Sequence, residues 1–204
     1  NGYLTRAEIF LSGEFLTIYT LIGGIFALYQ GINEIGGKIE DHTIINYLSK
    51  KISRSSFFLW QSITNFYYLI SSNALVWIGI YLSFVTFTTQ ENLPFGYFFW
   101  GFISTSILFS TICSLAQLLS ISFNRNIAIF SGIATLVFSW FLNSLSNLSS
   151  YTAWLKPLSI YYYLNIDKLQ SDFGLDLFRL IVLILLASAG YWVGERKLLQ
   201  KNIY

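Results

Sequence analysis

Side chains that could carry out catalysis are scarce in this sequence of 204 residues. His42 and Cys113 are its one histidine and its one cysteine, and they lie far apart along the chain. A single histidine without clustered cysteines or carboxylates does not make a metal site, and one distant cysteine does not complete a nucleophilic pair with it. The Gly-x-Ser-x-Gly and His-Glu-x-x-His patterns of hydrolases and metalloproteases are also absent. We therefore expect no enzyme activity, no metal and no cofactor in this chain.

The sequence likewise lacks the phosphate-binding pattern Gly-x-x-x-x-Gly-Lys-Ser/Thr, so the chain does not bind ATP by that route. Its net charge is only +2, and its basic residues are scattered. A nucleic-acid-binding domain normally concentrates basic residues in a patch or stripe. The charge pattern therefore gives no reason to expect nucleic acid as a partner.

The composition of the chain indicates that most of its structural elements lie in a lipid bilayer. Hydrophobic residues make up 54% of the chain and charged residues 11%, and the mean hydropathy is +0.57. Soluble domains carry about 25% charged residues, so this chain has too little charge to coat a globule that faces water. Residues 66–87 contain no Asp, Glu, Lys, Arg or His, and about 20 apolar residues are enough to cross a bilayer as a helix.

The apolar runs predict an all-α, polytopic transmembrane helix bundle with five visible spans. We place these spans at about 15–35, 57–87, 95–123, 127–148 and 176–194. The second and third are longer than a perpendicular crossing needs, so we expect them to be tilted or kinked. No repeat or linker interrupts the series, and residues 1–204 are expected to form one domain with an external loop at 149–175.

Lysine and arginine are distributed unequally between the two sides of these spans. The richer set of connections contains Lys38, Lys50, Lys51, Arg54, Arg125, Arg196, Lys197 and Lys201, and the poorer set contains Arg6, Lys156, Lys168 and Arg179. Because cytoplasmic loops retain Lys and Arg, we expect a multi-pass protein of the cytoplasmic membrane with its C-terminus inside the cell. Asn1 then lies outside, so we also expect a sixth span that precedes Asn1 in the gene product.

Small residues recur at every fourth position in the first and third spans. The two series are Gly23, Ala27 and Gly31, and Ser106, Ser110 and Ser114. Small side chains on one face let membrane helices approach closely, which favours a role in helix packing. The alternative is that the serines form a polar strip along a substrate path.

The connection between the first two spans, residues 38–56, reads as a short amphipathic helix. Ile44, Ile45, Leu48 and Ile52 recur at a spacing that would place them on one helical face. Asp41 or Thr43 would cap its start by accepting hydrogen bonds from free backbone N–H groups of the first turn. Such a helix can lie on a membrane surface or dock into a groove of another protein.

The same segment carries a resemblance to a known family. An acidic stretch leads to Thr43, an aliphatic run leads to Leu48-Ser49, and a hydrophobic-Ser-Arg step, Ile52-Ser53-Arg54, leads into the next span. This order, to which Glu40 also contributes, resembles the signature of type-2 ABC exporter permeases. The departures from the family pattern are His42 in place of Gly, Lys51 in place of Pro and Gln61 in place of Lys.

Two further stretches resemble the same family. Residues 154–161 are similar to its Pro-containing external loop before the last span, and residues 194–200 are similar to its basic C-terminal tail. The family normally has six spans, so five visible spans agree with the expectation of another span upstream.

The resemblance implies a mechanism as well as a fold. Two permease subunits, this chain and a second copy or a paralogue, would face each other above two separate ATPase subunits, which would hold the ATP and Mg. Each amphipathic segment would act as a coupling helix in a cleft of its ATPase. The expected ATPase contacts are Glu40, Asp41, Thr43, Ile44, Tyr47 and Leu48, and the expected contacts with lipid headgroups or the partner are Lys50, Lys51 and Arg54.

The leading hypothesis is therefore the transmembrane permease subunit of an ATP-driven ABC exporter, moving an amphipathic or apolar substrate. The alternative is a non-transporting membrane scaffold or a lipid-modifying membrane protein, in which the amphipathic segment only rests on the membrane. Under the permease hypothesis, Ile44→Asp or Leu48→Asp should uncouple ATP hydrolysis from transport. Under the alternative there is no ATPase partner to uncouple.

Overall fold

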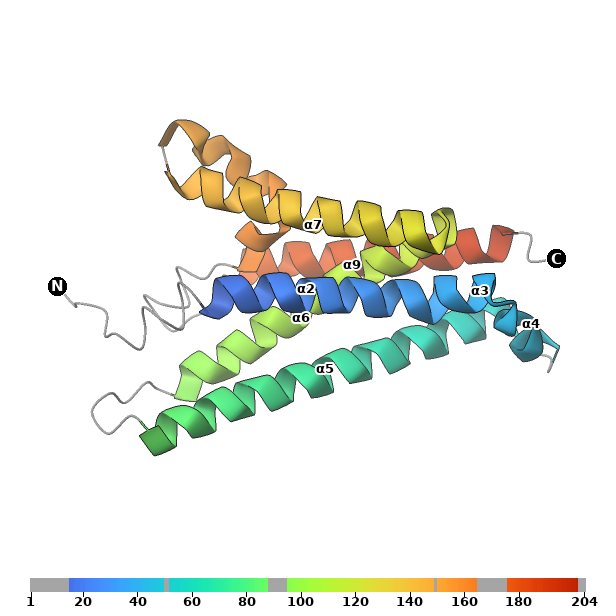
Figure 1. The fold of residues 1–204 in the computed structure, drawn as a ribbon, viewed down its shortest axis with the longest axis horizontal. Coiled ribbons are helices and arrows are strands. Elements are labelled where there is room, and N and C mark those ends of the chain that lie inside the picture. The colour runs from blue at the N-terminus through green and yellow to red at the C-terminus, as the bar shows by residue number, and fades with distance from the viewer. Residues whose placement is uncertain (1–14, 50–51, 88–94, 149, 165–175, 202–204) are drawn as a thin grey trace.

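Five long helices run roughly side by side in the computed structural model, which describes residues 15–49, 52–87, 95–148, 150–164 and 176–201 (Figure 1). Within these residues the helices are long and apolar enough to cross a membrane, and no strand is present. The prediction of an all-α bundle with five visible spans is therefore confirmed.

The first long helix is built from three consecutive pieces. These are α2 (Leu16–Ile32), a π-helical turn η2 (Asn33–Gly37) and α3 (Lys38–Glu40). Then come α4 (Thr43–Leu48), α5 (Arg54–Phe87), α6 (Phe95–Ser122), α7 (Arg125–Leu148), the 3-10 helices η3 (Ser150–Leu158) and η4 (Ile160–Leu164), and α9 (Leu177–Gln200). The 3-10 helices lie within the stretch that was expected to be an external loop.

Helix α9 ends at Gln200 and not at residue 194, where its apolar run stops. An apolar run marks the part of a helix that lipid can cover, whereas the helix itself ends where its backbone hydrogen bonds end. Lys197 lies in the last turn of α9, where a positive charge interacts favourably with the helix dipole. The helix therefore continues past the predicted span.

Helix α6 is the centre of the bundle. Its most apolar stretch is 67% buried, whereas those of the other long helices are 17–39% buried. The main core joins α6 to α2, α7 and α9 and includes Leu28, Phe109, Leu136 and Leu183. Because α6 is covered on most sides, its many small residues serve close contact with neighbouring helices.

Helix α5 lies at the edge of the bundle and runs obliquely to α2 (Figure 1). Its 34 residues make it about 51 Å long at about 1.5 Å per residue, well beyond the hydrocarbon thickness of about 30 Å. The helix is therefore inclined to α2, and the tilt to the membrane that its length suggests stays a prediction. Its contact with α6 includes hydrogen bonds from Asn73 Nδ2 to the hydroxyls of Thr105 and Ser106.

The connections of the bundle gather at two opposite ends (Figure 1). One end contains α4, the start of α5, the turn between α6 and α7, and the last turn of α9. Its described basic residues are Lys38, Arg54, Arg125, Arg196, Lys197 and Lys201, and we call it the basic end. The opposite end holds η3, η4 and the start of α9, with Lys156 and Arg179. The described members of the two groups inferred from charge therefore lie at opposite ends, whereas Arg6, Lys50, Lys51 and Lys168 lie outside the described residues.

Candidate functional site

The segment from Lys38 to Ser49, which we call the α3–α4 segment, turns sharply at His42. His42 has a φ of 55°, in the left-handed region, which most residues avoid but which histidine adopts more readily than bulky or branched residues. It stands at the position where the resembled family pattern has Gly, the residue best suited to that conformation. The backbone bond from Asp41 N to Gly37 O, 2.9 Å long, closes the end of α3 before the turn.

Helix α4 is shorter than the sequence predicts, and its start has no side-chain cap. It covers only Thr43–Leu48, and His42, not Asp41, occupies the capping position. Thr43 donates its hydroxyl proton to the carbonyl oxygen of Lys38 at 3.3 Å. The predicted cap by Asp41 or Thr43 is therefore wrong, because the left-handed turn at His42 directs the chain into α4 without one.

The predicted apolar face of this segment is also wrong. Ile44 is fully buried, whereas Ile45 and Ile52 are 40% and 37% exposed. The helix ends at Leu48, so Ile52 does not continue its periodicity. The side chain of Leu48 and the whole of residues 50–51, including Lys50 and Lys51, lie outside the part of the chain that the structure describes.

Ile44 anchors α4 to the rest of the bundle. Its side chain belongs to a buried cluster whose other members come from η2, α5, α6 and α9: Ile35, Phe57, Phe58, Ile121 and Leu198. A partner protein could not reach this side chain while the cluster is intact. We therefore correct the assignment of Ile44 from a contact residue to an anchor that holds α4 in place.

The exposed residues of the α3–α4 segment include Glu40, Asp41, Thr43, Ile45 and Tyr47. The sequence reasoning did not assign Ile45 to the site, although the exposed side chains of Ile45 and Tyr47 both offer apolar area to a partner. The Tyr47 ring packs against Phe57 with 5.5 Å between centroids. Tyr47 is therefore partly fixed by α5 while 40% of it stays exposed.

Glu40 connects the α3–α4 segment to α7. Its Oε1 accepts a hydrogen bond of 2.6 Å from the backbone N–H of Arg125, the first residue of α7. The first N–H groups of a helix have no partner within it, and a negative charge near them is favourable. Glu40 therefore ties the end of α3 to the start of α7.

Lys38 connects the same segment to α5. Its Nζ donates to Glu34 Oε2 at 2.7 Å and to Gln61 Oε1 at 2.6 Å. Gln61 is one of the positions at which the chain departs from the resembled pattern. The end of the first long helix is thus fixed by a salt bridge to Glu34, one helical turn earlier, and by a hydrogen bond to Gln61 of α5.

Arg54 connects the start of α5 to the end of α9. Its Nη1 donates to the carbonyl oxygens of Leu199, at 3.2 Å, and Lys201, at 2.8 Å. The last carbonyls of a helix lack partners within it, so a guanidinium is well placed there. Contact of Arg54 with lipid headgroups, which the sequence suggested, stays a prediction.

The small residues singled out from the sequence lie at helix contacts. A Cβ added to Gly31 would meet the carbonyl oxygen of Cys113 at 2.6 Å, and one added to Gly23 would clash with the Phe109 ring. Ala27 is fully buried in the main core. Ser114 lies against Gly190 of α9, whose added Cβ would meet its Oγ at 2.7 Å.

Ser106 and Ser110 are buried and hydrogen-bonded within the chain. Ser110 donates to the carbonyl oxygen of Ser106 at 2.8 Å, and Ser106 accepts from Asn73 Nδ2 at 2.7 Å. Asn73 Oδ1 also accepts a hydrogen bond of 2.5 Å from the Tyr19 hydroxyl, so Asn73 joins α2, α5 and α6. These bonds leave little free polar surface along the serine series.

Among the residues that the structure describes, no group of three or more His, Cys, Asp or Glu could hold a metal ion. No protein-family model and no curated protein matches the chain. The site is thus defined by its own geometry: a helical bundle with membrane-spanning length and hydropathy, and a short helix fixed at its basic end with one side exposed.

Proposed function

We propose that this chain is the membrane-spanning permease subunit of an ATP-driven exporter whose ATPase is a separate chain. The observation that carries the proposal is the attachment of α4. Ile44 is buried beneath it, while Ile45 and Tyr47 remain exposed on its outer side. A protein that seats against the exposed side would therefore act on an element that is already fixed to the bundle.

The connections around α4 support a role in transmitting movement. Glu40 bonds to the start of α7, Lys38 bonds to α5, and the Ile44 cluster includes Leu198 of α9. Ile121 of α6 belongs to the same cluster, so four long helices meet the α3–α4 segment directly or through one side chain. A displacement of this segment by ATP-driven closure of a partner would move helix ends together and would not be absorbed by a loose loop.

The charge distribution supports placing the basic end in the cytoplasm, where an ATPase would have access to it. Six of the described basic residues lie there and two lie at the opposite end, which fits the tendency of cytoplasmic connections to retain Lys and Arg. In this arrangement the protein sits in the cytoplasmic membrane with its C-terminus inside. Two ATPase subunits and a second permease, as a copy or a paralogue, would complete the complex.

The test uses the exposed side of α4, because a charge at Ile44 would disrupt the buried cluster that holds α4 in place. Ile45→Asp should lower ATPase binding roughly tenfold, because a few residues near the centre of an interface contribute most of its binding energy. Asn126→Asp is the matched control, since it adds the same charge at the same end on an exposed residue of α7. ATPase association and transport are measured with both subunits in reconstituted vesicles.

The scaffold or lipid-modifying alternative predicts a different result. In that case the chain, extracted in mild detergent, brings down no P-loop ATPase, and Ile45→Asp behaves as Asn126→Asp does. Either result would refute the permease proposal. Transport that persists in Ile45→Asp with normal coupling to ATP hydrolysis would also contradict it.

A further inference from the structure

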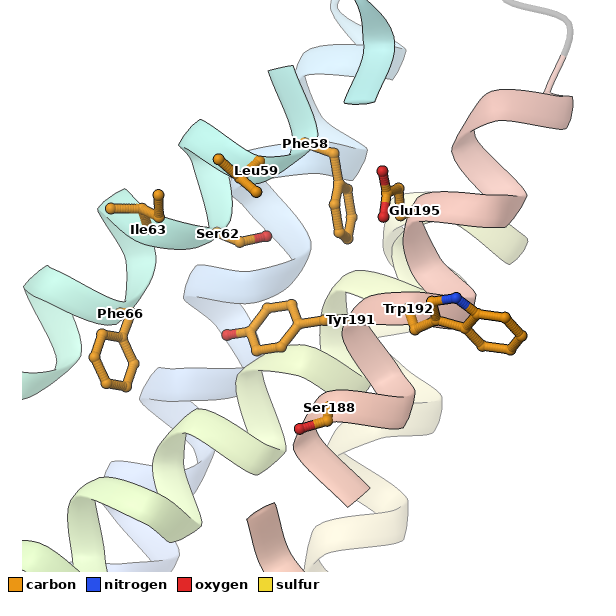
Figure 2. A pocket seen from close by; sticks show the side chains of 9 residues that line it. All are labelled: Phe58, Leu59, Ser62, Ile63, Phe66, Ser188, Tyr191, Trp192 and Glu195. Carbon is orange, nitrogen blue, oxygen red and sulfur yellow. The ribbon is translucent and has the colours of Figure 1, made fainter. Parts of the chain in front are cut away.

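A groove runs between α5 and α9, and residues of α6 line the part of it that is farther from the basic end. It consists of two adjoining cavities of about 430 Å³ and 450 Å³ that share Phe66, Ser188 and Tyr191 as lining residues. Figure 2 shows the part near the basic end, where Tyr191 reaches from α9 toward α5 and Glu195 lies near Phe58. We call this the α5–α9 groove.

The length of the α5–α9 groove fits one leaflet of a bilayer. Along α5 it extends from Phe58 to Ile70, which is about 18 Å at about 1.5 Å per residue. The hydrocarbon core of a bilayer is about 30 Å thick, so one leaflet contributes about 15 Å. A chain that enters at the level of Glu195 would therefore reach the middle of the membrane at the far end of the groove.

The walls of the groove suit an alkyl chain. Leu59, Ile63 and Ile184 line it and are about half exposed, with no part of the described chain covering them. The serine hydroxyls along it are occupied, since Ser110 donates to Ser106 O and Ser188 donates to Ile184 O, both at 2.8 Å. An acyl chain would gain apolar contact there without displacing these serine hydroxyls from their partners.

Glu195 lines the mouth of the groove, and Arg196 is the next residue of α9. Glu195 accepts a hydrogen bond from the Ser55 hydroxyl, and among the residues that the structure describes it forms no ion pair. The guanidinium of the adjacent Arg196 lies over the Trp192 ring, with its Cζ 5.3 Å from the ring centroid. A carboxylate next to a guanidinium matches a headgroup in which an ammonium is linked to a phosphate.

We propose that the α5–α9 groove binds a phospholipid with a primary-ammonium headgroup, in the leaflet at the basic end. The acyl chain lies between α5 and α9, the ammonium donates to Glu195, and the phosphate accepts from Arg196. A primary ammonium has N–H bonds for the carboxylate, whereas a quaternary ammonium has none and an anionic headgroup lacks the positive charge. The proposal does not depend on an ATPase partner, so it stands or falls separately from the exporter function.

The test measures which lipids the full-length chain retains. The protein is reconstituted in nanodiscs of phosphatidylethanolamine, phosphatidylcholine and phosphatidylglycerol in equal amounts, then released and weighed by native mass spectrometry. The wild type should retain phosphatidylethanolamine in preference to both others. Glu195→Gln should reduce that preference roughly tenfold, because a charge-assisted hydrogen bond becomes a neutral one.

Filling the groove provides an independent variant. Ser188→Trp should abolish lipid retention of every class, whereas Ala189→Trp, one residue away on an exposed position outside the groove lining, should retain lipid as the wild type does. Equal retention of the three lipids by the wild type would overturn the proposal. Unchanged retention in Ser188→Trp would do so as well, even where Glu195→Gln fails to fold.

Discussion

Around α6 the helices contact one another through small side chains and buried hydrogen bonds, whereas the α3–α4 segment is attached to the bundle by one buried isoleucine and a few polar contacts. Gly31 brings α2 against the backbone of α6 at Cys113. At the basic end, by contrast, Ile44 is buried while its neighbour Ile45 is 40% exposed. Shape complementarity fixes the middle of the bundle, and single contacts fix its end.

The difference shows how one chain can combine a stable core with an accessible surface. Close packing covers most sides of α6, so that region contributes mainly stability and offers a protein partner little surface. The α3–α4 segment is fixed at Ile44 and Glu40 and keeps its outer side open. If this comparison is correct, substitutions in the two regions should differ in how much stability they remove, in how far along the chain the effect reaches, and in whether the effect depends on salt.

The largest effect is expected from Ile44→Ala, which removes a fully buried side chain. Truncating a buried isoleucine costs about 2–5 kcal/mol, and here the loss should appear as detachment of α4 and not as unfolding of the whole bundle. Hydrogen exchange of the α4 amides should become much faster, while exchange in α6 stays unchanged. Ile45→Ala is the control and should leave α4 exchange near the wild-type rate.

A smaller but global effect is expected from Gly31→Ala in the middle of the bundle. The added Cβ would meet the carbonyl oxygen of Cys113 at 2.6 Å, and overpacking of this kind costs about 1–3 kcal/mol. Thermal unfolding in detergent should shift downward for the whole protein. Gly79→Ala is the matched control, because nothing lies within 4 Å of its added Cβ. Alanine is also the better helix former, so Gly79→Ala should unfold at or above the wild-type temperature.

The contrast between these regions also explains which features could be predicted from the sequence. Long apolar runs fix the number of spans, because any helix in lipid must satisfy its own backbone polar groups. Four-residue spacing of small side chains likewise identified positions that now lie at helix contacts, such as Gly23 and Gly31. Both signals are local and repeat over several turns.

The burial of residues in the α3–α4 segment could not be predicted in the same way, because it depends on a single turn. Periodicity alone places Ile44 and Ile45 on the same broad face, but the left-handed backbone at His42 sets which of them points into the bundle. The Ile44 cluster draws on residues as distant in sequence as Leu198, which no local pattern reveals. The carboxylate of Glu40 and the start of α7 likewise come together only in the folded chain.

The smallest predicted effect, and the one most specific to the basic end, is that of Glu40→Gln. The amide can still accept a hydrogen bond from Arg125 N, but the negative charge at the start of α7 is lost, which costs about 0.3–1 kcal/mol at low ionic strength. Hydrogen exchange in the first turn of α7 should become faster at low salt. At high salt the difference from the wild type should shrink, because the Debye length falls to about 3 Å at 1 M.

Asp41→Asn is the control. It removes the same charge from the next, exposed residue and should leave hydrogen exchange in α7 unaltered. If both variants change it equally, the general charge of the basic end and not the bond from Glu40 fixes the α3–α4 segment. A steric contact such as that at Gly31 should show no salt dependence at all, which makes ionic strength the variable that separates the two regions.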